Sequence, residues 1–300
     1  MQYMNKSPYY QVSVLMAVKN ESLYLKDSLL SISRQSNVNI QIILVDDHST
    51  DNTYQIAVDL LTQIPGLFVY SNPGSGKVDA YNFAYSLATS DYVCFFAGDD
   101  IMPNDSMYER LLPLIGFDHS LRVASICKIR ILSSNKSLNG KLIPKAKGKA
   151  NLSGQSPLFS RSLANQIFPI PNCLPNEDHW TYAFMTYCPI DYLITLDTIC
   201  CDWRLHSGNS YDRNSSCREY RSHLIPRYGA YEELYRYRKH LLSDSSAIGL
   251  KNHIRLIDSY INQNLFSFFF SPVPFSQKVT LLRSFNALFF SLFKILDKLR

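Results

Sequence analysis

The chain has 300 residues, of which 46% are hydrophobic and 18% charged, and its formal net charge at pH 7 is +5. This length and composition allow one substantial core or two modest ones and exclude an intrinsically disordered protein. No stretch reaches the roughly 18 apolar residues that span a bilayer, and the seven scattered cysteines lack the CxxC spacing of a thiolate zinc site and suggest no disulfide framework.

The first third of the chain alternates between strand and helix patterns. Short apolar, β-branched runs predict strands at 11–18, 40–45, 67–71 and 91–97. Helical patterns follow the first three runs, from about 25 to 35, from Ser49 or Thr50 as N-cap to about 62, and from about 78 to 88. This rhythm predicts parallel βαβ units with helices on both faces of a sheet.

Beyond residue 105 the alternation loosens. The patterns predict a helix near 105–115, an extended segment at 123–132, a loop running into a helix that Pro189 closes, a strand at 192–196, and helices after about 216. Between them, Lys141, Lys145, Lys147 and Lys149 lie within nine residues. Such a basic cluster favours a phosphate-bearing partner or an anionic membrane face, and it suits an ordinary solvated loop equally well.

Polar groups follow three of the predicted strands at their C-terminal ends. Lys19-Asn20-Glu21, Asp46-Asp47 and Asp99-Asp100 should converge on one edge of the sheet, where ligands of parallel sheets bind. Asp46 and Asp47 also suit a helix-capping role. Asp99 and Asp100 end a buried strand, where two carboxylates repel each other and lose solvation unless a cation compensates. They therefore predict a Mg²⁺ or Mn²⁺ site that a diphosphate ligand completes.

Several stretches carry a resemblance to a known family. VSVLMAVKNESLYLKDSLLSISRQS, IILVDDHSTDNT and SGKVDAYNFAYSLATSDYVCFFAGDDIMPND resemble the nucleotide-sugar-binding half of inverting family-2 glycosyltransferases, and PNEDHW and DWRLHSGNS resemble motifs of the acceptor half. The resemblance implies an α/β protein with the GT-A fold, which has a Rossmann-like, mostly parallel (mixed) sheet flanked by helices. It places a donor half at 1–105 and an acceptor half at 106–215, before a helical region at 216–300.

The resemblance also implies a nucleotide pocket. Asp47, with Asp46 beside it, would accept the N3–H of the base, and Ala17, Asn20 and Glu21 would line the base and ribose. Lys77 ends a GSGK loop that lacks the spacing of a P-loop, and it is a further candidate for a nucleotide contact.

Metal and catalytic roles follow from the same resemblance. Asp99 with Asp100 would hold the Mn²⁺ or Mg²⁺ that bridges the diphosphate, His206 falls where some relatives place a metal or phosphate contact, and Asp178 matches the catalytic base. The first aspartate of the usual Asp-x-Asp-Asp is replaced by Ala97, which weakens the expected metal site. By local sequence alone, His206 suits an ordinary loop histidine, and Glu177-Asp178 suit the acidic first turn of a helix. Trp180 is expected in the core.

The tail at 278–300 combines a narrow polar stripe with a broad face of leucine and phenylalanine. Such a helix suits a membrane surface, and it equally suits packing on the catalytic domain or on another subunit. We favour peripheral membrane contact, because a lipid-linked acceptor would be met there. The N-terminal MQYMNKSPYY lacks an apolar segment, so we expect no secretory signal and a cytoplasmic protein with reduced thiols.

The expected function is sugar transfer, with inversion, from a nucleotide-diphosphate sugar (a UDP-sugar is favoured) to a glycan or lipid-linked acceptor; no nucleic acid is expected as a partner. One alternative is a nucleotidyltransferase that makes activated sugars. That class needs a glycine- and arginine-rich loop after the first strand, which AVKNES does not supply. Another is a non-catalytic nucleotide-sugar binder, which the missing first aspartate makes conceivable.

Overall fold

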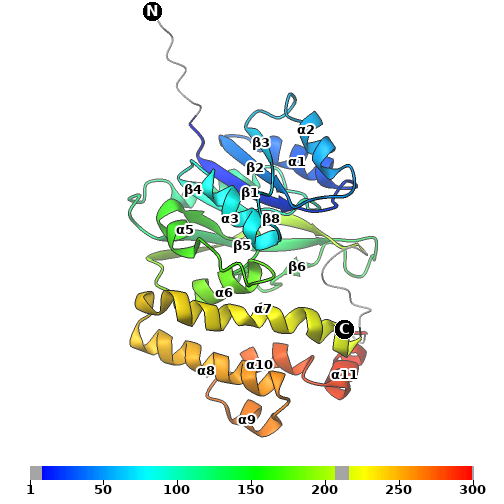
Figure 1. The fold of residues 1–300 in the computed structure, drawn as a ribbon, viewed down its shortest axis with the longest axis vertical. Coiled ribbons are helices and arrows are strands. Elements are labelled where there is room, and N and C mark those ends of the chain that lie inside the picture. Colours follow the sequence, from blue (N-terminus) through cyan, green and yellow to red (C-terminus); the bar gives the residue numbers. More distant parts are fainter. Residues whose placement is uncertain (1–8, 207–215, 299–300) are drawn as a thin grey trace, which may run out of the picture. The chain divides into compact units, whose positions relative to one another are not determined.

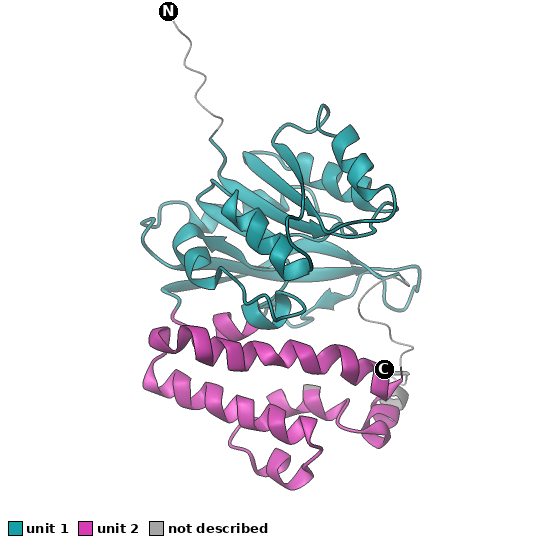
Figure 2. Ribbon diagram, in the orientation of Figure 1, with its two compact units in different colours: residues 1–181, 190–206 teal, residues 182–189, 207–300 magenta. Residues whose placement is uncertain are grey.

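The structure, a computed structural model, describes residues 9–206 and 216–298 (Figure 1). The described residues form two compact units (Figure 2). Unit 1 takes those of 1–181 and 190–206, and unit 2 takes those of 182–189 and 207–300. The expected donor and acceptor halves both fall mainly in unit 1, and the boundary between them stays a prediction.

Unit 1 is built on one mixed eight-stranded sheet. The strand order is β3-β2-β1-β4-β7-β5-β6, and β8 pairs with the other edge of β5. β1 to β4 are mutually parallel, β7 runs antiparallel to both β4 and β5, and β8 runs parallel to β5. The strands are β1 (Val12–Val18), β2 (Ile40–Asp46), β3 (Leu67–Ser71), β4 (Tyr92–Phe95), β5 (Val123–Leu132), β6 (Leu142–Ile143), β7 (Leu158–Ser160) and β8 (Tyr192–Arg204).

The first four strands confirm the parallel βαβ pattern expected from the sequence. β1 and β2 are buried on both faces, as central parallel strands are, which explains their continuous apolar runs. The helices that return the chain are α1 (Leu25–Ser33), α2 (Thr53–Asp59) and α3 (Lys77–Ser86). The N-cap expected for α2 at Ser49 or Thr50 is wrong, because the helix begins after Asn52. Ser49 and Thr50 instead bond with the backbone and side chain of Asn20.

The remaining elements of unit 1 carry the chain back to the sheet. The expected helix at 105–115 is α4 (Ser106–Leu111) with a 3₁₀ turn at Leu112–Leu114, and α5 (Arg161–Ile167) follows β7. α6 (Asp178–Tyr187) begins in unit 1, where Trp180 is fully buried and donates its indole N–H to the carbonyl of Ile167 at 3.0 Å, confirming its core position. The predicted strand at 192–196 is only the first part of β8.

Unit 2 is helical. Its elements are α7 (Cys217–Arg238), a 3₁₀ turn at Lys239–Leu241, α8 (Asp244–Ile261), α9 (Leu265–Phe270), α10 (Phe275–Leu282) and α11 (Ala287–Lys298). The single amphipathic helix expected within 278–300 is wrong, because α10 ends at Leu282 and α11 begins at Ala287. Leu281, Leu282 and Phe285 are buried inside the unit, so these residues of the expected apolar face do not reach the surface. Among the described residues, no helix has the length and apolar character needed to cross a bilayer.

Candidate active site

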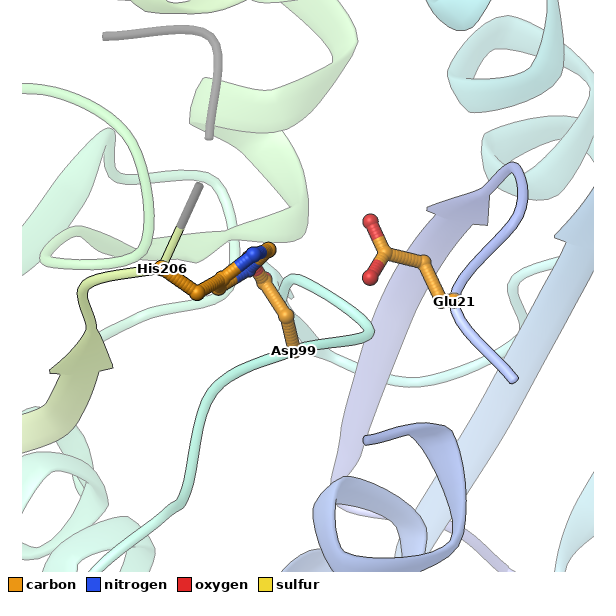
Figure 3. Close-up of side chains that lie close together, drawn as sticks. All are labelled: Glu21, Asp99 and His206. Atoms are coloured by element: carbon orange, nitrogen blue, oxygen red, sulfur yellow. The ribbon is translucent and has the colours of Figure 1, made fainter. Parts of the chain in front are cut away.

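Three loops bring acidic and imidazole groups together at one edge of the sheet in unit 1. Glu21 follows β1, Asp99 follows β4 and His206 follows β8. One ligand atom from each of these residues lies within 4.8 Å of the other two. Figure 3 shows the Glu21 carboxylate pointing toward Asp99 and His206 from the opposite side of the gap. The predicted convergence of strand ends therefore occurs, and it includes a histidine from far along the chain.

Arg204 fixes the Asp99 loop against the end of β8. Its Nε donates to the backbone carbonyl of Asp99 at 2.9 Å, and its backbone N–H donates to Oδ1 of Asp100 at 2.7 Å. The guanidinium lies over the Tyr24 ring, 4.6 Å from its centroid, and the same ring packs against His206 at 4.8 Å. Sequence reasoning missed Arg204 and Tyr24. The signal for Arg204 was its place in DWRLHSGNS, two positions before His206.

Asp100 lies beside the three-residue group but is held by protein donors. Its second carboxylate oxygen accepts from the side-chain amide of Gln155, so both oxygens are engaged. Burial, followed by the neighbouring Asp99 carboxylate, raises the pKa of Asp100 to about 7. Burial and the carboxylates of Asp99 and Asp100 likewise raise the pKa of Glu21 to about 7. The edge thus gathers more negative charge than its own residues neutralise.

This donor set fits a divalent cation. Two carboxylates and an imidazole suit Mn²⁺, and a cation among them would offset the burial and the repulsion that raise the pKa values of Glu21 and Asp100. Glu21, expected in the nucleotide pocket, lies close to Asp99 and His206 and is the second carboxylate of this group. Gly98 permits the approach, because a Cβ at this position would lie 2.8 Å from Cγ1 of Val18 and 3.3 Å from Cγ of Glu21.

Asp47 is a buried acceptor at the end of β2. Its Oδ1 accepts from the Asn72 side chain and from the Gly76 backbone N–H, both at 2.8 Å, and its Oδ2 lies 3.6 Å from Nζ of Lys19. Burial alone would raise the pKa of Asp47, but these donors outweigh it and lower that pKa. The carboxylate is therefore ionised, and its oxygens act only as hydrogen-bond acceptors.

Asp46 and Asn20 shape the neighbouring loops. Oδ2 of Asp46 accepts from the Ser49 backbone N–H at 3.0 Å, whereas its Oδ1 is buried with no hydrogen-bond partner. Neither Asp46 nor Asp47 caps α2, so the helix-capping interpretation is wrong for that helix. Oδ1 of Asn20 accepts from the backbone N–H of Thr50 at 2.8 Å, while Ala17 pairs with β2 within β1.

Lys77 interacts electrostatically with Glu21 and with the Glu177-Asp178 pair. Its Nζ lies 3.1 Å from Oε1 of Glu177, which is buried. Partial burial would lower the pKa of Lys77, but Glu177 outweighs this effect, and Asp178 also acts to raise that pKa. The same ammonium acts to lower the pKa of Glu21, so both groups of carboxylates lie within its field. Asp178 is the first residue of α6 and is half-buried, so its position also matches the acidic first turn considered from sequence.

Known proteins resemble this chain in sequence. The family model described as glycosyl transferase family 2 matches residues 13–164. An uncharacterized glycosyltransferase of Haemophilus influenzae is 33% identical over 101 residues, which are 33% of this chain and 40% of that protein. The chain spans half or less of the length of the first curated relatives it matches.

Two solved structures have the same fold. One is S. aureus TarS, residues 1–349, in complex with UDP-GlcNAc, with a TM-score of 0.61 and 18% identity over 92% of this chain and 80% of that one. The other is the mannosyltransferase PcManGT from Pyrobaculum calidifontis in complex with GDP-Man and Mn²⁺, with a TM-score of 0.58 and 15% identity over 98% of this chain and 81% of that one. The mixed sheet with its flanking helices is the expected GT-A fold. The family model matches more than half of the 300 residues of this chain, so the chain belongs to glycosyl transferase family 2.

Proposed function

We propose that this protein transfers a sugar, with inversion, from a nucleotide-diphosphate sugar to a hydroxyl of a glycan or lipid-linked acceptor. The observation that carries the proposal is the meeting of Glu21, Asp99 and His206 at the carboxyl edge of the sheet. Open α/β sheets bind their ligands at this edge, and the donor set suits the cation that accompanies a diphosphate. A UDP-sugar is the favoured donor, in line with the UDP-GlcNAc complex of a protein with the same fold.

The donor nucleotide would lie against the ends of β1 and β2. Asp47, ionised and fixed by Asn72 and Gly76, keeps Oδ2 as the acceptor for an N–H of the base. Asp46 lies beside it with a buried Oδ1 that has no protein partner. Asn20 holds the β2 loop through Ser49 and Thr50, and Ala17 lies within β1. The side chain of Lys77 is 43% exposed and would contact a phosphate oxygen.

The main requirement of the reaction is to stabilise the negative charge that builds on the leaving diphosphate. Glu21, Asp99 and His206 would hold Mn²⁺ or Mg²⁺, which supplies positive charge to offset the negative charge that builds on the diphosphate. Arg204 holds the Asp99 loop in place through the Asp99 carbonyl and the Asp100 carboxylate. These residues then need little reorganisation as the sugar–phosphate bond breaks.

Asp178 is the proposed general base. Its carboxylate takes the proton of the acceptor hydroxyl while that oxygen attacks the anomeric carbon, and the diphosphate leaves from the opposite face. A single displacement of this kind inverts the anomeric centre. General-base assistance contributes about 10²–10⁴-fold to the rate.

A thermal-shift panel tests the proposal. The protein is heated with UDP, GDP, dTDP or CMP, each with and without Mn²⁺. A matching nucleotide with metal should stabilise the fold by about 2.7 kcal/mol at a hundredfold excess over its dissociation constant. If no nucleotide raises the melting temperature in the presence of Mn²⁺, the proposed donor site is wrong.

A further inference from the structure

Unit 2 exposes a compact group of large apolar side chains around α9. We call it the α9 patch. Phe266 and Phe270 are each 75% exposed, and their rings pack on each other with centroids 4.6 Å apart. Single exposed apolar residues are common on proteins, but a contiguous aromatic group marks an interaction surface. The patch consists of Leu265, Phe266, Phe269, Phe270 and Phe275.

The exposure is built into the fold. Between the two outward phenylalanines, Phe268 is fully buried and packs edge-on against Phe285 at 4.9 Å. The side chain of Asn264 caps the start of α9 by accepting from the Ser267 N–H at 3.0 Å. The buried ammonium of Lys278 donates to the carbonyls of Phe269 at 2.7 Å and Ser271 at 2.8 Å, which fixes the end of the helix. A short helix held at both ends therefore presents its aromatic side chains outward.

The distribution of charged residues in unit 2 indicates what kind of partner binds the α9 patch. Residues 262–277 contain no Asp, Glu, Lys or Arg, so the segment itself supplies no charged side chain of the kind found at the rims of protein interfaces. The C-terminal region as a whole is strongly basic: residues 216–300 hold 13 lysines and arginines and six aspartates and glutamates, whereas the whole chain holds 30 and 25. An uncharged aromatic tip on a basic helical unit matches an anionic bilayer better than a protein partner.

Cations gather on the two helices that precede α9. A cleft of about 600 Å³ on α7 and α8 is lined by four of them, Arg236, Lys239, Lys251 and Arg255. Glu232 is the one carboxylate in its lining. Lys239 and Lys251 lie 5.5 and 5.1 Å from the centroid of the same ring, that of Tyr235, so two like charges are held close together. Such a site favours the phosphate oxygens of lipid headgroups.

We propose that unit 2 docks on the surface of an anionic phospholipid bilayer, with the α9 patch entering the boundary between headgroups and acyl chains and the cations of α7 and α8 attracting phosphate headgroups. The inference goes beyond the proposed sugar transfer, since it depends on neither the donor site nor the chemistry. It also replaces the apolar face expected at 278–300, part of which is buried.

Vesicle co-sedimentation of the full chain tests the proposal. Vesicles of phosphatidylcholine alone are compared with vesicles that also contain phosphatidylglycerol. The double variant Phe266→Ser/Phe270→Ser should lose affinity for the mixed vesicles by about tenfold or more for each phenylalanine. Leu112→Ser/Ile115→Ser, which changes two exposed apolar residues of unit 1 (52% and 53% exposed), is the matched control and should sediment like the wild type.

A second variant tests the charge. Lys251→Gln/Arg255→Gln should weaken binding to the mixed vesicles by roughly fivefold for each charge and leave binding to neutral vesicles unchanged. Wild-type protein that binds neither vesicle, or a phenylalanine double variant that binds like the wild type, overturns the proposal. So does a lipid-free dimer of the wild type that the phenylalanine substitutions abolish, because the patch would then join two copies of the chain.

Discussion

Nε2 of His206 lies 3.0 Å from Oδ2 of Asp99, although 107 positions separate the two residues in the sequence. The long strand β8 makes this contact possible, since it pairs with β5 along most of its length and ends at the edge where β1 and β4 also end. The group that fits a metal is therefore complete only when the middle of the chain has folded onto the first four strands.

Asp99→Asn should abolish the stabilisation that Mn²⁺ gives with nucleotide. The amide removes a negative charge from a group of three ligands, and the stabilisation of about 2.7 kcal/mol expected near a hundredfold ligand excess should shrink to nearly nothing. Thermal shift with and without Mn²⁺ measures it. Asp59→Asn, in α2, is the control and should keep the full metal response. A metal response of wild-type size in Asp99→Asn would place the cation elsewhere.

Asp178→Asn should bind the donor and fail in turnover. The amide keeps the shape of the side chain at the start of α6 but cannot take up a proton. We expect kcat to fall by about 10²–10⁴-fold while the nucleotide-dependent thermal shift stays at the wild-type value. Equal loss of binding and turnover would instead mean that Asp178 serves the helix or the donor pocket.

Arg204→Lys should weaken the metal site without removing a ligand. Lysine keeps the charge but loses the Nε–H that reaches the Asp99 carbonyl and the flat guanidinium that lies on Tyr24. Residues that orient metal ligands typically change metal affinity by about 10–100-fold when replaced. Titration of Mn²⁺ against protein with saturating nucleotide measures the change. Arg34→Lys, on a residue next to α1, is the control and should leave the affinity unaltered.

The sequence patterns predicted the first four strands and the edge at which their loops meet, because continuous apolar runs and βαβ spacing are local properties. The family resemblance assigns Glu21 to the nucleotide pocket, whereas in the structure Glu21 lies close to Asp99 and His206, because Gly98 lets the β4 loop approach its side chain. Nothing local in the sequence indicates how closely the β4 loop approaches Glu21.

Other features depend on pairing across long stretches of chain. Asp100 accepts hydrogen bonds from the Gln155 side chain and from the Arg204 backbone, which lie 55 and 104 positions away in the sequence. Sequence periodicity cannot predict such long-range bonds. The buried Lys278 closes α9 by donating to two backbone carbonyls, and no local pattern in the sequence indicates this role. A charged residue satisfied by backbone groups defeats reasoning from hydrophobic pattern alone.

The ion pair between Lys77 and Glu177 should contribute to the free energy of unfolding. Lys77→Met leaves the buried Glu177 carboxylate without its cation, and we expect a loss of about 1–3 kcal/mol in the free energy of unfolding. The double variant Lys77→Met/Glu177→Gln removes the charge as well and should recover much of that loss. Urea unfolding of the wild type, both single variants and the double variant gives the coupling energy. Additive effects would show that the pair contributes nothing through its contact.

Acid should destabilise unit 1 partly through Asp191, which precedes β8 and clamps it to the start of β5. Its carboxylate accepts from the side chain of Arg122 at 2.6 and 3.0 Å and from the Arg122 backbone N–H at 2.8 Å. These bonds lower the pKa of Asp191 from 3.8 to about 2. Because the folded-state pKa is the lower one, the contribution is fully present above the unfolded-state pKa and is lost as the pH falls through the folded-state value.

Asp191→Asn should therefore flatten the pH dependence of the unfolding free energy between about pH 4 and pH 2. The pair is partly exposed, with 26% and 27% of the two side chains accessible, so we expect only about 1 kcal/mol at neutral pH. Urea unfolding at a series of pH values measures the slope. Arg122→Gln removes the same interaction from the other side and should give the same flattened curve. Curves that run parallel to the wild type in both variants would mean that other carboxylates carry the acid sensitivity.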